Sequence, residues 1–123
     1  LSTQPLEGVF GESAKIFEQC CEMADVIGGL PSRDRDFGDV KHVQRILSIG
    51  KEMNKPVDVH VDQENNPAEK ETEMLARETI KAGMEGKVRA VHSISLAAHD
   101  KQYQHYVADL LKDAYQGKAL VVG

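Results

Sequence analysis

The sequence has no excess of basic residues and no basic tail. Its 20 acidic residues outnumber its 15 basic residues, and the formal net charge is −5. Proteins whose main partner is nucleic acid gather lysine and arginine against the phosphates, so this charge pattern argues against such a partner. No apolar run approaches the roughly 20 residues that cross a bilayer, and a membrane-spanning protein is therefore not expected.

The N-terminal residues and the two cysteines indicate the cellular compartment of the protein. Leu1–Pro5 has neither the charged start nor the apolar centre of a secretory signal. It also lacks a starting methionine, so we expect the chain to begin inside a longer reading frame. The only two cysteines, Cys20 and Cys21, are adjacent, and a disulfide between neighbours strains the backbone. Two reduced thiols on a helix fit a cytoplasmic protein.

Several motifs that would define other classes are absent. Gly28-Gly29 lacks the Gly-x-Gly-x-x-Gly spacing of a dinucleotide site and instead indicates a place where a backbone or a ligand approaches closely. Neither Gly-x-Ser-x-Gly nor a Ser/His/Asp signature is present. A flavodoxin-like domain would need a phosphate-binding loop after a strand, and none is visible. The acidic run from Glu69 to Glu73 is expected to be a solvated helix start.

Helix-like and strand-like segments alternate along one domain, residues 1–123. The expected helices are Glu12–Met23, Asp39–Met53, a segment opened by Asn66 and Pro67 and ended by Gly83 and Gly86, and a segment marked by Tyr103–Leu111 and closed by Gly117. The expected strands are Ala24–Pro31, Pro56–Val61, Val88–Ile94 and Ala119–Gly123. Ser32–Asp36 is read as a charged loop. Strands recur about every 31 residues, and this order predicts an α/β fold with a parallel sheet and right-handed crossovers. A solenoid also has such a period, but these units share no sequence pattern.

Side-chain alternation gives one strand a polar face. The valines of Val57–Asp62 point one way, and the polar side chains point the other way: Asp58, His60 and Asp62. One polar face suits the interior of a barrel better than a doubly wound sheet. The same parity is expected to point three side chains of the next strand inward: Ala90, His92 and Ile94.

Two histidines are the strongest candidates for chemistry. His60 and His92 end valine-rich strands and are 32 residues apart, so neighbouring βα units would bring them to the same edge of the sheet. Two imidazoles there indicate a metal, although zinc or iron normally needs three or more protein ligands. His42 and His105 lie in helical segments and are expected to face solvent. His99 follows the third strand and is a weaker candidate for a metal ligand at the same edge of the sheet.

Four segments together resemble the amidohydrolase superfamily, close to cytosine deaminase and related metal-dependent hydrolases. They are Thr3–Gly8, Ala24–Pro31, Asp58–Gln63 and Gly86–His92. The family fold is a TIM (β/α)₈ barrel with one or two metal ions at its C-terminal mouth. The resemblance implies a partial barrel, about strands three to seven, in which Val26 lies in strand four and Ala119–Val122 is strand seven.

The resemblance also implies roles for individual residues. His60 would be the metal ligand at the end of strand five, and His92 would lie near the metal at the end of strand six. Gln4 and Gly29 would contact the substrate. Gln63 stands where these deaminases have a glutamate that shuttles protons, and an amide cannot accept and return a proton at neutral pH. Hydrolysis that relies on a divalent zinc or iron ion and an aspartate of strand eight would survive this change.

A complete barrel takes about 250 residues, so several elements of the family are missing from this chain. Strands one, two and eight are absent, with the His-x-His pair and the aspartate that they carry. We therefore expect a fragment of a metal-dependent hydrolase acting on C–N bonds, other than peptide bonds, of small cyclic or nitrogen-rich compounds, and an isolated chain without activity. The alternative is a non-catalytic half-barrel that serves as a structural domain. In either case open sheet edges and an uncovered face predict a homo-oligomer.

Overall fold

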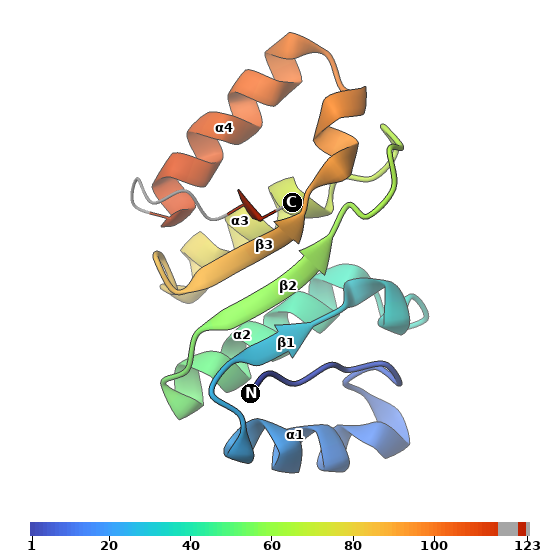
Figure 1. Ribbon diagram of the computed structural model, residues 1–123, viewed down its shortest axis with the longest axis vertical. Helices are drawn as coiled ribbons and strands as arrows, with labels where there is room; N and C mark the ends of the chain where they lie inside the picture. The colour runs from blue at the N-terminus through green and yellow to red at the C-terminus, as the bar shows by residue number, and fades with distance from the viewer. Residues whose placement is uncertain (116–120, 123) are drawn as a thin grey trace.

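A parallel sheet with helices packed along one of its faces forms the centre of the molecule (Figure 1). The computed structural model describes residues 1–115 and 121–122. The helices are α1 (Ala14–Met23), α2 (Asp39–Met53), α3 (Glu71–Ala82) and α4 (Lys101–Tyr115). The strands are β1 (Ile27–Gly29), β2 (Val57–Val61), β3 (Val88–His92) and β4 (Val121–Val122), in the sheet order β1-β2-β3-β4. Short 3-10 turns lie at η1 (Gly11–Ser13), η2 (Pro31–Asp34) and η3 (Ile94–Ala98).

All neighbouring strands of this sheet are parallel. Each strand is joined to the next through a helix, and this confirms the predicted α/β alternation. The expected Asp39–Met53 helix has the bounds of α2. Residues 117, 119, 120 and 123, which carry the predicted helix stop and most of the predicted last strand, lie outside the described residues.

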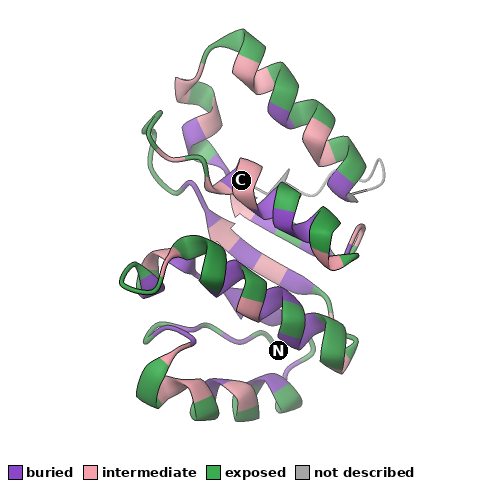
Figure 2. Ribbon diagram, turned by 180° about the vertical axis from the view of Figure 1, so that it is seen from behind, coloured by how far each residue is buried: buried purple, intermediate pink, exposed green. Residues whose placement is uncertain are grey.

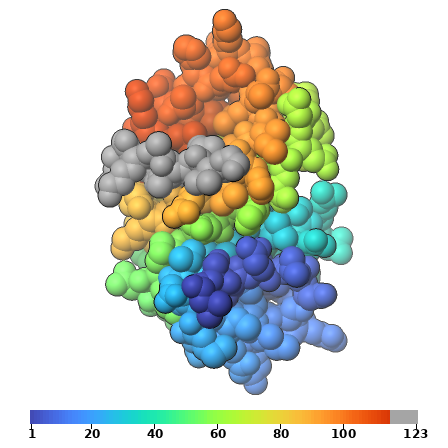
Figure 3. Space-filling model, viewed as in Figure 1, coloured from blue at the N-terminus to red at the C-terminus, as the bar shows by residue number. Residues whose placement is uncertain are grey.

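The core lies between the sheet and the helices α2 and α3 (Figure 2). Val57, Val59 and Val61 of β2 are fully buried there, as their alternation predicts. On the opposite side of the strand, Asp58 and His60 stay half-buried. We call this second side, which carries Asp58 and His60, the open face. In the space-filling view, atoms of β2 and β3 reach the surface there, next to the N-terminal segment (Figure 3).

The N-terminal segment adds a further parallel partner to the sheet. Ser2 forms a parallel bridge with Val26, and the Thr3 amide donates to the Val26 carbonyl at 3.2 Å. Thr3 Oγ1 accepts from the Gly28 amide at 2.7 Å, and a Cβ on Gly28 would lie 1.8 Å from the Thr3 carbonyl oxygen. The close approach expected at the glycine pair is therefore a backbone contact at Gly28. As a result, Gln4 follows a strand-like segment of the same sheet.

Two expected boundaries move for local reasons. The third helix begins at Glu71 and not at Pro67, because Asn66 Oδ1 accepts from the Ala68 amide at 3.0 Å and closes a separate turn. The charged loop after β1 is partly ordered as η2, in which Asp34 is buried.

The prediction for His42 was wrong. His42 is completely buried, with Nε2 accepting from the Leu30 amide at 2.9 Å and Nδ1 lying 2.5 Å from Asp34 Oδ2. The same carboxylate oxygen accepts from the Val9 amide at 2.8 Å. Burial lowers the pKa of His42 against the opposing effect of Asp34. The imidazole therefore ties α2, η2 and the loop after Gln4 together.

The parity predicted for the third strand was also wrong. Ala90 is paired with Val59 and is fully buried in the core. Arg89 faces the other way, where its Nε lies 3.5 Å from Asp58 Oδ1. Ile94 lies beyond the strand in η3 and is 43% exposed. The side chains of β3 that point into the core are those of Val88 and Ala90. A His92 in regular extended conformation would therefore also point into the core.

Candidate active site

The two predicted histidines meet on the open face of the sheet. His60 Nδ1 lies 3.1 Å from His92 Nε2, and the ring centroids are 5.1 Å apart. His60 lies in the extended part of β2, one residue before its end, and His92 ends β3. Because the strands are parallel neighbours, the sheet brings together two side chains that are 32 residues apart in sequence.

His92 reaches this face through an unusual backbone conformation. Its φ is 81° and that of Ser93 is 55°. The strand therefore turns out of its regular alternation at its last residue, and the His92 ring faces His60 and not the core. Residue patterns in the sequence give no signal for this turn, because neither position is a glycine.

Gln4 is the third predicted residue in this group. Its Nε2 lies 3.5 Å from His60 Nε2. With the amide nitrogen as donor, His60 Nε2 accepts, and the imidazole proton lies on Nδ1, which donates to His92 Nε2. Side chains from the N-terminal segment, β2 and β3 thus form one short hydrogen-bonded row, although β1 lies between the first two of these segments in the sheet.

The environment keeps His60 neutral. Burial lowers its pKa most, the neighbouring His92 lowers it further, and Asp58 acts in the opposite direction. A neutral imidazole retains a lone pair, which is the form that binds a metal ion. The donor set therefore fits a divalent ion of the zinc or iron kind, but it supplies only two nitrogens, and a complete site needs further ligands.

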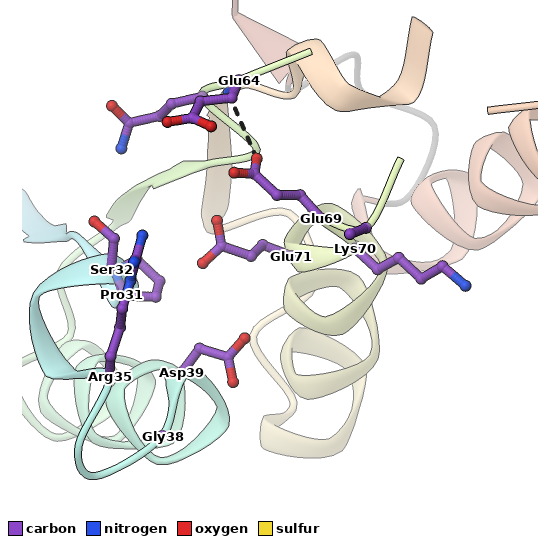
Figure 4. Close-up of a pocket in the computed structure, with 11 residues that line it drawn as sticks. Pro31, Ser32, Arg35, Gly38, Asp39, Glu64, Glu69, Lys70 and Glu71 are labelled. Atoms are coloured by element: carbon purple, nitrogen blue, oxygen red, sulfur yellow. Dashed lines mark hydrogen bonds between the residues drawn. The ribbon is translucent and has the colours of Figure 1, made fainter. Parts of the chain in front are cut away.

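Gly29 and Gln63 are not part of this row. A Cβ on Gly29 would lie 3.2 Å from a methyl group of Val59 and 3.5 Å from Ile46, so this glycine makes room for the core. Gln63 is exposed and lines a cleft of about 440 Å³ between η2, the start of α2 and the loop after β2 (Figure 4). The described residues that line the cleft do not include His60 or His92.

Asp62 leaves the face on which the alternation placed it. Its carboxylate accepts from the amides of Glu71 and Thr72, both at 2.9 Å, while Glu71 Oε1 accepts from the Asp62 amide at 3.0 Å. This reciprocal pair fixes the start of α3 to the end of β2 and resembles a capping box. Burial raises the pKa of Glu71 to about 6.

Sequence reasoning missed the acidic group beside that cap. Asp62, Glu69 and Glu71 each offer a carboxylate oxygen, and these oxygens lie within 4.8 Å of one another. The available signal was an aspartate at a strand end followed by glutamates at a helix start. Figure 4 shows the Glu69 and Glu71 carboxylates on the side of the cleft formed by the loop and α3.

The remaining histidines lie apart from the pair. His99 Nε2 is 3.3 Å from the Glu69 carbonyl, and its ring packs on Tyr103 with centroids 4.2 Å apart. His105 is exposed, as predicted. In the described part of the chain no helix is long and apolar enough to cross a membrane.

The parallel sheet with helices on one side resembles part of the (β/α)₈ barrel of amidohydrolases. The same region of fold occurs in the 5-methylcytosine deaminase of Klebsiella pneumoniae, solved with phosphonocytosine and with 5-fluorocytosine. That structure matches with a TM-score of 0.81 and 30% identity over 92% of this chain and 28% of its own length. The N-isopropylammelide isopropylaminohydrolase of Burkholderia multivorans matches with a TM-score of 0.76 at 21% identity, over 98% of this chain and 31% of its own.

A curated protein of Haemophilus influenzae, described as uncharacterized, is 42% identical over 116 residues. The match covers 92% of this chain and 42% of that relative, so the chain spans less than half of the curated protein that it matches. No family model matches the sequence.

Proposed function

We propose that this chain supplies part of the catalytic domain of a cytosine deaminase-like, metal-dependent hydrolase. The reaction is hydrolysis of C–N bonds, other than peptide bonds, in small cyclic or nitrogen-rich compounds. The observation that carries the proposal is the 3.1 Å approach of the His60 and His92 nitrogens at adjacent strand ends. It is supported by the 30% identity and the TM-score of 0.81 to a protein described as a deaminase.

His60 and His92 would hold the metal ion. When bound, a divalent zinc or iron ion supplies the acidity that makes water a nucleophile at neutral pH. His60 enters this role already neutral, because burial and His92 lower its pKa. Gln4 orients His60 and offers a hydrogen bond to a substrate ring beside it.

Gln63 limits the reactions that this site would catalyse. It stands three residues after His60, and its amide does not carry a proton from water to a leaving group. We therefore propose substrates whose hydrolysis needs no second proton shuttle at this position. Gly29 would act indirectly, by letting β1 pack closely on Val59 beneath the site.

The remaining assignments follow from the same proposal. The partner is a small-molecule substrate, and the further metal ligands and the catalytic aspartate come from outside residues 1–123. We place the protein in the cytoplasm, where the unpaired Cys20 and Cys21 would stay reduced.

Metal analysis of the purified chain tests the proposal. About one zinc ion per chain is expected when zinc is added in excess, because the two histidines alone bind it weakly. Binding should be lost in His60→Ala and retained in His105→Ala, which removes an exposed histidine elsewhere. Retention of the ion in His60→Ala would refute the assigned site. A chain that binds no zinc at neutral pH even when zinc is added in excess would favour the second candidate, a non-catalytic half-barrel, for which the open face is the supporting observation.

A further inference from the structure

The position of His92 needs an explanation that its own strand does not provide. The register pairs His92 with Val61, which is fully buried in the core. Paired residues of parallel strands point to the same side of the sheet, so a regular β3 would place the His92 ring among the core valines. The left-handed conformations of His92 and Ser93 are what turn the ring toward His60.

These conformations are energetically unfavourable for residues with a side chain. They persist only where surrounding contacts determine them. The Ser93 amide donates to the Val61 carbonyl at 3.1 Å, and the Ile94 amide donates to the Asp62 carbonyl at 2.8 Å. The backbone of β2 therefore holds one side of the turn.

The first turn of α3 holds the other side. Thr72 Oγ1 lies 2.5 Å from Asp62 Oδ2 and 2.8 Å from Ser93 Oγ. An ionised carboxylate only accepts, so Thr72 donates to Asp62 and the Ser93 hydroxyl donates to Thr72. All three side chains are buried, with exposures of 0 to 6%. Hydrogen bonds in such a place are strongly orienting, because none of the groups has water as an alternative partner.

We propose that Thr72 is a positioning residue for the histidine pair. Its hydroxyl, anchored by Asp62, holds Ser93 in the left-handed turn and thereby keeps the His92 ring facing His60. The importance of this role for metal binding rests on the proposed function. The role itself concerns the geometry of the metal-free protein.

Thr72→Val removes the hydroxyl and keeps the shape of the side chain. Thr79→Val is the matched control, because Thr79 is equally buried in α3 and its hydroxyl donates only to the Leu75 carbonyl, at 2.7 Å. Thr72→Ser should rescue the effect, since it restores the hydroxyl. Ser93→Ala cuts the same link from the other side and serves where Thr72→Val does not fold.

The measurements are the nuclear Overhauser effect between the His60 and His92 ring protons in the metal-free chain, and the affinity for added zinc. We expect Thr72→Val and Ser93→Ala to lose the ring contact and to bind zinc about 10- to 100-fold more weakly. Thr79→Val and Thr72→Ser should keep both. An unchanged ring contact in Thr72→Val or Ser93→Ala, or an equal loss in Thr79→Val, would overturn the proposal. Loss of the ring contact in Thr72→Val together with no zinc binding by the unaltered chain would support the positioning role and count against the proposed function.

Discussion

His60 and His92 arrive at the same place by different means. His60 points to the open face because the regular alternation of β2 puts it there, opposite the buried Val59. His92 arrives through two successive left-handed residues. The orientation of His60 needs only the regular strand, whereas that of His92 depends on a few buried hydrogen bonds. At the scale of residues, the histidine pair is therefore only as rigid as the turn at Ser93.

Replacing Glu71 with glutamine should stabilise the protein at neutral pH. Burial raises the pKa of Glu71 from 4.5 to about 6, so the folded state disfavours the carboxylate. This free-energy cost of ionisation is absent below the unfolded pKa of 4.5 and is complete above about pH 6. In Glu71→Gln the side-chain Oε1 can still accept from the Asp62 amide. The expected gain near neutral pH is about 1 kcal/mol, after allowance for solvent screening of the partly exposed group.

Urea denaturation of Glu71→Gln, compared with the unaltered chain near pH 7.5 and near pH 4, measures this gain. Glu64→Gln, on an exposed side chain of the same cleft, is the control and should change little. An equal gain at both pH values would show that the effect does not come from ionisation.

His42 should make the fold acid-sensitive. Its folded pKa is lowered, mainly by burial, so the unfolded chain takes up a proton at a higher pH than the folded chain does. The stability it contributes is present above the unfolded pKa of about 6.5 and is lost as the pH falls below that value. The variant His42→Gln should be less stable overall, yet show a smaller loss of unfolding free energy between about pH 7 and pH 5.5. A pH dependence equal to that of the unaltered chain would contradict this assignment.

At the scale of residues, the orientation and burial of some side chains could be predicted from the sequence, and those of others could not. The alternation of β2 gave the orientations of His60 and the three valines, because an extended strand obeys a period of two. The orientation of Ala90 was wrong because His92 was assumed to continue the strand. The burial of His42 was missed because its partners, Asp34 and the Leu30 amide, come from a loop that showed no pattern.

The elements next to the site are joined by specific contacts at their ends. Asp62 connects the end of β2 with the start of α3, and Gly28 lets the N-terminal segment pair with β1. Alternation of helices and strands was predictable, since apolar spacing encodes it. The start of α3 and the pairing of Leu1–Thr3 were not, because each depends on a contact between residues that are distant in sequence.

The variant Gly28→Ala should detach the N-terminal segment. A Cβ there would lie 1.8 Å from the Thr3 carbonyl oxygen, which is backbone and has no room to move within the bridge. We expect a loss of about 2 kcal/mol or more in stability and loss of the contact between Gln4 and His60. Gly29→Ala is the control, because its Cβ would meet side-chain methyl groups at 3.2 Å or more. Amide hydrogen exchange at Thr3 and Gly28 should rise only in Gly28→Ala, and equal behaviour of the two variants would refute the explanation.

At the scale of the whole molecule, the sheet is covered by helices on one side only among the described residues. The open face carries polar groups that pair with one another, as Arg89 does with Asp58. It also carries Val91, which is half-buried. In barrels of this kind such a face becomes the interior, and the solved deaminase chain is more than three times as long as the part matched here.

We therefore expect the 123-residue chain to self-associate through the open face. The variant Val91→Lys should weaken association, because it places an uncompensated charge in the contact. Gln102→Lys, on an exposed position of α4, is the matched control. Sedimentation equilibrium of the three proteins measures the effect. A monodisperse monomer for the unaltered chain would contradict the expectation.

The ligand environment of a bound metal ion tests the central claim most directly. X-ray absorption of the zinc-loaded chain should show two imidazole nitrogens at about 2.0–2.1 Å. Their number should fall to one in His92→Ala and remain two in His105→Ala. A zinc ion bound without imidazole, or with the same imidazole count in His92→Ala as in the unaltered chain, would contradict the account of the His60–His92 site.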